Sequence, residues 1–221
     1  MLTPNIDEAL RYLGIPAPAS AGLREQAERV SQRLCSALRP RWVWRMFPLE
    51  RTEAGFSLSG ADITLTGDTA RTMLTQCHSA VLLACTLGAE FDALLRAEQA
   101  RDMSGAAVLD ALGSAYVEAG CDRAEQEISA RLPDKFLTDR FSPGYGDLPL
   151  ALQPALCALL DTPRRLGVTV GESFLMNPCK SVTAIIGIAD TPQPARVRGC
   201  GYCTMRETCQ LQKNGHGCHG K

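Results

Sequence analysis

Residues 104–132 carry small and apolar side chains at helical spacing. Val108, Leu112, Ala115, Ala119 and Ile128 form the stripe, and glutamate and arginine pairs mark the opposite face. Pro133 closes the pattern, because proline interrupts a helix. The segment therefore predicts one long amphipathic helix with a buried side.

Shorter elements of both kinds surround this helix in the sequence. Apolar periodicity, turn residues and prolines predict the other helices at 6–13, 20–38 and 149–160, with one after Gly67 that holds Met73, Leu74 and Cys77 and one after Thr86-Leu87-Gly88. The expected strands are 42–50, 56–59, 61–66, 79–85, 168–170 and 181–188. Helices and strands do not alternate as βαβ units, so the pattern favours an α+β fold.

Composition excludes several classes of function. The formal net charge of -1 and the aromatic content of 5% argue against a general nucleic-acid binder, which needs a basic face and stacking rings. The first residues lack the basic region of a signal peptide, and no apolar run approaches the ~20 residues of a membrane span. We therefore expect a cytoplasmic protein that binds neither nucleic acid nor membranes.

The segment 140–147, Arg-Phe-Ser-Pro-Gly-Tyr-Gly-Asp, is too rich in turn formers to be a helix or a central strand. The guanidinium of Arg140 is suited to a two-pronged bond with a carboxylate. Gly144 allows close approach of a flat ligand, and Tyr145 adds a ring and a hydroxyl. Taken alone, this pattern favours a rigid surface turn with a salt-bridged arginine over a ligand site.

The wider context resembles a known family. The 140–147 block, Leu159-Leu-Asp161, the run 166–178 and Ser181-Val182 look like the S-adenosylmethionine (AdoMet) core of the activation domain of cobalamin-dependent methionine synthase. Softer likeness extends over roughly residues 75–190. The resemblance implies a C-shaped α+β domain with a twisted, mainly antiparallel sheet and flanking helices. It also implies reductive activation: cob(II)alamin gains an electron, and AdoMet remethylates the cob(I)alamin that results.

Residues are carried over from the family only where the motif matches. Arg140 would pair with the AdoMet carboxylate, the Gly144-Tyr145 stretch would hold the adenosine or methionyl part, and Glu118 would meet the α-amino group. Glu172 and Ser173 also match the family, with a turn role as the equal alternative. No Asp-x-His-x-x-Gly motif for cobalamin is present. The cofactor is therefore expected on a partner, a methionine synthase or another corrinoid protein, with a flavodoxin- or ferredoxin-type electron donor.

The C-terminal segment 191–221 is distinct from residues 1–190. After Thr191-Pro-Gln-Pro, four cysteines follow with the spacing C-x2-C-x5-C-x8-C, at Cys200, Cys203, Cys209 and Cys218. Four thiolates close a tetrahedral zinc site or ligate an iron–sulfur cluster, and His216 or His219 could replace one of them. Five Lys or Arg against one acid in this segment would offset an anionic cluster. The need for an electron favours iron–sulfur, with zinc as the alternative.

Two rival functions remain at this stage. One is activation of a different corrinoid methyltransferase, because an AdoMet groove does not identify the partner. The other is an electron-transfer or zinc-binding interaction module that has lost its AdoMet site.

Overall fold

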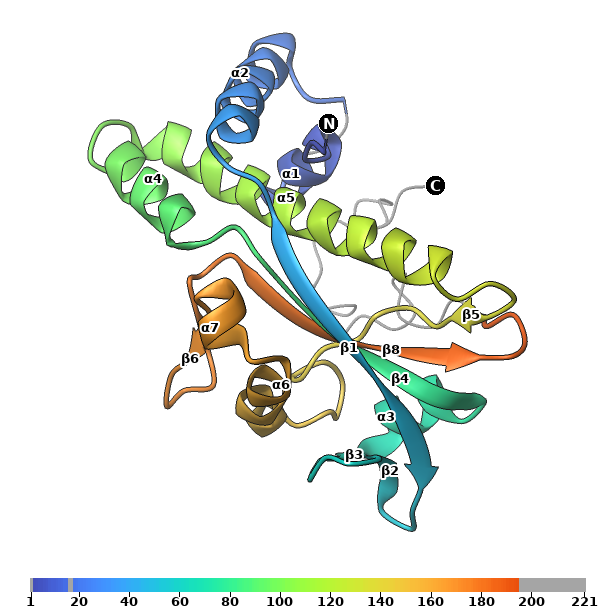
Figure 1. Cartoon of the computed structure of the whole chain (residues 1–221). Helices are drawn as coiled ribbons and strands as arrows, with labels where there is room; N and C mark the ends of the chain where they lie inside the picture. Colours follow the sequence, from blue (N-terminus) through green and yellow to red (C-terminus); the bar gives the residue numbers. More distant parts are fainter. Residues whose placement is uncertain (1, 16–17, 195–221) are drawn as a thin grey trace.

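The computed structural model describes residues 2–15 and 18–194, and its centre is a six-stranded antiparallel sheet (Figure 1). The strand order is β3-β2-β1-β4-β8-β5, and a separate hairpin pairs β6 with β7. The strands are β1 Arg41–Arg51, β2 Gly55–Leu58, β3 Thr64–Thr66, β4 Cys77–Thr86, β5 Phe136–Leu137, β6 Thr169–Val170, β7 Met176–Asn177 and β8 Ser181–Ala189.

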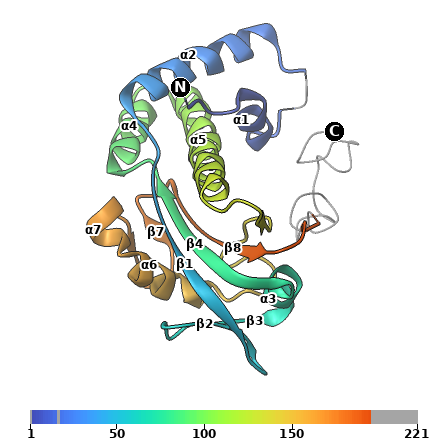
Figure 2. The ribbon, with the colours of Figure 1, turned by 45° about the vertical axis from the view of Figure 1, so that its right-hand side comes forward.

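Helices cover both faces of this sheet. One face carries α1 (Ile6–Tyr12), α2 (Ala21–Ala37), α4 (Ala89–Gln99) and α5 (Met103–Ala130), which Figure 2 shows together above the strands. The other face carries α3 (Gly67–Leu74), α6 (Gln153–Leu160) and α7 (Thr162–Leu166), and the short 3-10 helix Leu150–Leu152 precedes α6. The α+β class with a twisted antiparallel sheet and flanking helices is confirmed.

Strands β4 and β8 are central because their side chains are apolar on both faces. Val81, Leu83 and Cys85 point into the core under α5, whereas Leu82 and Ala84 point into the core over α6. A continuous apolar run is the pattern expected of a strand covered on both sides. Burial of both faces therefore explains why these two strands lie inside the sheet and not at its edge.

The long helix α5 packs closely because small residues lie at its contacts. A side chain at Gly113 would collide with the buried Phe91 ring, and one at Gly120 would collide with Pro40 and the Cys85 sulfur. Asp102 caps the helix by accepting a hydrogen bond from Ser104 N at 2.9 Å. The glycines therefore allow α5 to lie close against α4 and the start of β1.

Most expected elements are present, with two corrections. Cys77 does not belong to the helix after Gly67, because α3 ends at Leu74 and Cys77 begins β4. The expected helix 149–160 is divided: a 3-10 turn covers its start, and α6 proper begins at Gln153. Among the described helices, none is both long and apolar enough to traverse a bilayer. The cysteine segment lies outside the described residues.

Candidate functional site

Arg140 lies just beyond the edge strand β5 and points at α5. Its guanidinium meets three carboxylates from that helix, at positions that share one helical face: Glu118, Asp122 and Glu125. The Arg140 Nη2–Glu118 Oε2 distance is 2.5 Å and the Nη1–Asp122 Oδ1 distance is 2.7 Å; Nη1 also donates to Glu125. We call these four residues the Arg140 cluster.

Burial and charge both act on this cluster. The Arg140 side chain is 16% exposed and that of Glu125 20%, whereas Asp122 is 55% exposed. Burial alone would lower the pKa of Arg140, but the carboxylates of Glu118 and Glu125 outweigh it and hold that pKa above its ordinary value. One guanidinium faces three carboxylates, so two negative charges remain uncompensated within the cluster.

The loop after Arg140 is tied to the sheet. Phe141 is buried and exchanges two backbone hydrogen bonds with Ile185 of β8, at 3.0 and 2.8 Å. Gly144 N donates to Leu148 O at 2.8 Å, and Tyr145 N donates to Ser142 O at 3.0 Å. Gly144 has φ 85°, a left-handed conformation that glycine adopts without strain. These hydrogen bonds hold the loop in one turn conformation.

The far end of the loop caps a helix on the opposite face of the sheet. The Asp147 carboxylate accepts from Asp68 N at 2.5 Å and from Thr69 N at 2.9 Å, at the start of α3. Hydrogen bonds from Thr69 and Asp68 to this carboxylate lower the pKa of Asp147 to about 2. Gly67 and Gly146 permit the contact, because a side chain at either position would collide with Asp147 or Thr69. The sequence pattern around Gly67 did not predict this tertiary cap.

The structure brings some of the expected ligand residues together. Arg140 and Glu118 form an ion pair with each other. Their roles toward AdoMet stay predictions. Gly144 is exposed and Tyr145 half-buried in the same loop. Glu172 and Ser173 are exposed in the turn between β6 and β7. Cys200, Cys203, Cys209 and Cys218 fall outside the described residues.

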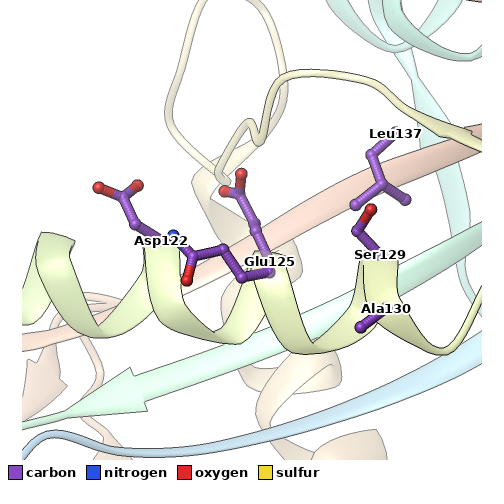
Figure 3. Close-up of a pocket in the computed structure, with 6 residues that line it drawn as sticks. Asp122, Glu125, Ser129, Ala130 and Leu137 are labelled. Atoms are coloured by element: carbon purple, nitrogen blue, oxygen red, sulfur yellow. The ribbon is translucent and has the colours of Figure 1, made fainter.

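A cavity of about 620 Å³ opens beside the cluster, toward the C-terminal end of α5 (Figure 3). It is lined by Asp122, Glu125, Gln126, Ser129, Ala130 and Leu137. In Figure 3, Leu137 of β5 lies opposite Ser129 of the helix. Three of the expected ligand residues, Glu118, Gly144 and Tyr145, do not line this cavity. The cavity therefore shares Asp122 and Glu125 with the Arg140 cluster but not these three residues.

Sequence reasoning missed Asp122 and Glu125. Their spacing from Glu118, four and seven residues along a predicted helix, was the available signal for a shared face. It also missed a second ion pair on α5, in which Lys180 Nζ lies 2.9 Å from Asp110 Oδ1 and donates to Ser114 Oγ at 2.8 Å. Polar residues at 110, 114, 118 and 122 recur every four positions and form one polar stripe along the helix. Among the described residues, no group of three or more His, Cys, Asp or Glu side chains is arranged to hold a metal ion.

The chain is similar in structure to a known AdoHcy-binding domain. No family model matches the sequence, and no curated protein matches it. The crystal structure of the MetH reactivation domain bound to AdoHcy matches with a TM-score of 0.64 and 18% sequence identity, over 93% of this chain and 76% of that chain. The chain therefore has the fold of that reactivation domain, as the resemblance in residues 75–190 predicted.

Proposed function

We propose that this protein binds AdoMet at the Arg140 cluster and serves the reductive activation of a cobalamin-dependent methionine synthase carried on a partner chain. The observation that supports it best is the cluster itself, a half-buried guanidinium among three helix carboxylates, in a chain that shares its fold with an AdoHcy-bound domain. The motif Arg140-x-x-x-Gly144-Tyr145 extends directly from this cluster.

The charges of the cluster suit AdoMet. The ligand carries a sulfonium and an ammonium against one carboxylate, a net positive charge. A cluster with two uncompensated negative charges attracts such a cation, and the partly dry surroundings of Arg140 strengthen the attraction relative to water. Glu118, at 33% exposure, is the carboxylate of the cluster that the family resemblance pairs with the ligand's ammonium.

Arg140 also retains hydrogen-bonding capacity for a ligand carboxylate. A guanidinium has five N–H donors. Contacts within the described residues occupy three of them, one to each carboxylate of the cluster. A ligand carboxylate can therefore bind Arg140 without displacing all of its present partners, and Glu118 is the partner that it would share.

The chemistry demands placement more than proton transfer. A donor supplies one electron to cobalt(II), and the sulfonium methyl then passes to cobalt(I) with AdoHcy as the leaving group, so no proton moves. The protein has to align the sulfonium with the partner's corrin and exclude water. The Arg140 cluster and the tied loop 141–148 offer a rigid platform for this alignment. We propose that the four tail cysteines hold an iron–sulfur cluster that relays the electron, or alternatively a structural zinc ion.

Calorimetric titration with AdoMet and AdoHcy tests the binding step. Arg140→Ala is expected to weaken binding by ~1.5–3 kcal/mol, the range for a hydrogen bond to a charged group. Glu118→Gln keeps the shape of the site but removes one charge, and it is expected to weaken AdoMet and AdoHcy alike, because both ligands carry the α-amino group that Glu118 is proposed to meet. Arg164→Ala is the matched control, because Arg164 is an 83% exposed arginine paired only with Asp161 among the described residues.

One observation favours a rival function. Arg140 is already paired with three carboxylates, as a purely structural arginine would be. If wild-type protein binds neither AdoMet nor AdoHcy, the electron-transfer or interaction module becomes the better account. If it does bind, incubation with reductant, AdoMet and a purified corrinoid protein should restore methylcobalamin, and the choice of corrinoid protein separates methionine synthase from other methyltransferases.

A further inference from the structure

The cavity beside Arg140 is not explained by the AdoMet proposal. Its lining combines a carboxylate rim, Asp122 and Glu125, with the polar side chains of Gln126 and Ser129 and the apolar surface of Ala130 and Leu137. Glu118, Gly144 and Tyr145 lie elsewhere. A space of about 620 Å³ that is lined by acidic, polar and apolar side chains suits a basic peptide with scattered apolar side chains.

Such a peptide is present in the same chain. Residues 191–221 hold five Lys or Arg and one Glu, whereas residues 1–190 hold 18 basic against 23 acidic side chains. The two parts of the chain therefore carry opposite charge, although the whole chain is almost neutral at -1. Apolar side chains are scattered among the basic ones, including Val197, Tyr202, Met205 and Leu211.

The end of the described chain lies within reach of the cavity. β8 ends at Ala189, which pairs with Phe136, and the next residue of β5, Leu137, lines the cavity. An extended chain spans up to ~3.3 Å per residue, so the segment after Pro194 is long enough to reach the cavity from the end of β8. We propose that residues 195–221 dock into the cavity formed by α5 and β5, with their basic side chains on Asp122 and Glu125.

Docking would also affect the proposed AdoMet site. This consequence, unlike the docking itself, rests on the proposed function. Asp122 and Glu125 contact Arg140 directly. A segment bound there would bring Cys200, Cys203, Cys209 and Cys218 toward the proposed AdoMet site. Whatever metal those cysteines hold would then lie near the sulfonium ligand. Docking itself requires neither the metal nor AdoMet.

Photochemical cross-linking of the full-length protein tests the proposal. The exposed cavity residue Ser129 is replaced by p-benzoylphenylalanine, the protein is irradiated, and adducts are mapped by mass spectrometry. We expect adducts with residues 195–221 within the same chain. The control position is Gln99, an exposed residue at the end of α4, which should give no such adducts. Adducts from position 129 only to other segments, or no adducts, would overturn docking, and adducts between two chains would assign the cavity to a second copy.

Charge and ligand variants sharpen the test. In 1 M salt, where the screening length falls to about 3 Å, the yield of the adduct should drop. The triple change Arg196→Gln, Arg198→Gln and Arg206→Gln should also lower it. Ser129→Arg should release the segment but leave AdoMet affinity intact. Loss of AdoMet binding in Ser129→Arg would show that the nucleotide itself occupies the cavity, which refutes docking while the proposed function survives.

Discussion

Replacement of Arg140 by methionine should cost the fold about 3 kcal/mol, because three helix carboxylates would lose their shared cation. Removal of one member of a buried ion pair costs ~3–5 kcal/mol, whereas an exposed pair is worth ~0–1 kcal/mol. Arg140 and Glu125 are mostly buried, Glu118 is one-third exposed, and Asp122 is more than half exposed. The expected cost lies at the lower end of the buried range, since methionine retains most of the side-chain packing.

Thermal unfolding followed by circular dichroism measures this cost. For a protein of this size, ~3 kcal/mol corresponds to a fall in Tm of about 6–12 °C. The control is Arg164→Met, which removes an exposed ion pair and should change stability by less than ~0.5 kcal/mol. The double variant Arg140→Met/Glu125→Gln should be more stable than Arg140→Met alone, because fewer uncompensated charges remain. If Arg140→Met unfolds within about 2 °C of the wild type, the cluster is not a buried charge centre, and the electrostatic basis of our AdoMet proposal is wrong.

Three further predictions concern the rest of the fold. The pKa of Asp147 is lowered, so its charge stabilises the fold above the unfolded-state pKa near 4, and this stabilisation is lost as pH falls through about 2. The free energies of unfolding of wild type and Asp147→Asn should therefore differ at pH 6 and converge toward pH 2. A difference that stays constant with pH would exclude the cap. Gly113→Ala should destabilise by ~1–3 kcal/mol through overpacking, whereas Gly22→Ala, which meets only open space on α2, should be neutral or stabilising by up to ~1 kcal/mol in urea unfolding. Partial burial and the hydrogen bond to Asp92 raise the pKa of Cys179 to about 11, so peptide mapping after iodoacetamide treatment at pH 8 should find slow alkylation that Asp92→Asn accelerates; equal rates would contradict that contact.

The sequence predicted the elements whose patterns are local. The α5 stripe, which Pro133 closes, and the apolar runs of β4 and β8 carry their structure in consecutive residues. The fold class followed from them. Cys77 was misplaced because an apolar residue three positions beyond Leu74 continues a helical period as well as it begins a strand. Only the pairing of Cys77 with Ala189 decides between the two.

The site was less predictable because its contacts are long-range. Arg140 was identified from its own loop, but its partners lie 15–22 residues earlier on a helix whose orientation toward the loop depends on the whole sheet. The Asp147 cap joins positions 78 and 79 residues apart. No spacing rule in a single sequence reports such pairs. Glu118 was proposed through resemblance, and geometry then added two neighbouring carboxylates.

The anchoring of the loop bears directly on how the protein could bind a ligand. Its first residue after Arg140 is hydrogen-bonded to β8, its middle carries two backbone turns, and its last acidic residue caps α3 on the other face of the sheet. A loop fixed at three places loses little conformational freedom when a ligand arrives, so more of the contact energy is retained as affinity. If AdoMet binds here as proposed, the same rigidity would hold its sulfonium at a constant height above the loop, which suits a transfer to a reactant that arrives on another protein. Loosening the α3 cap by Asp147→Asn should therefore weaken AdoMet binding although Asp147 is absent from the expected ligand contacts.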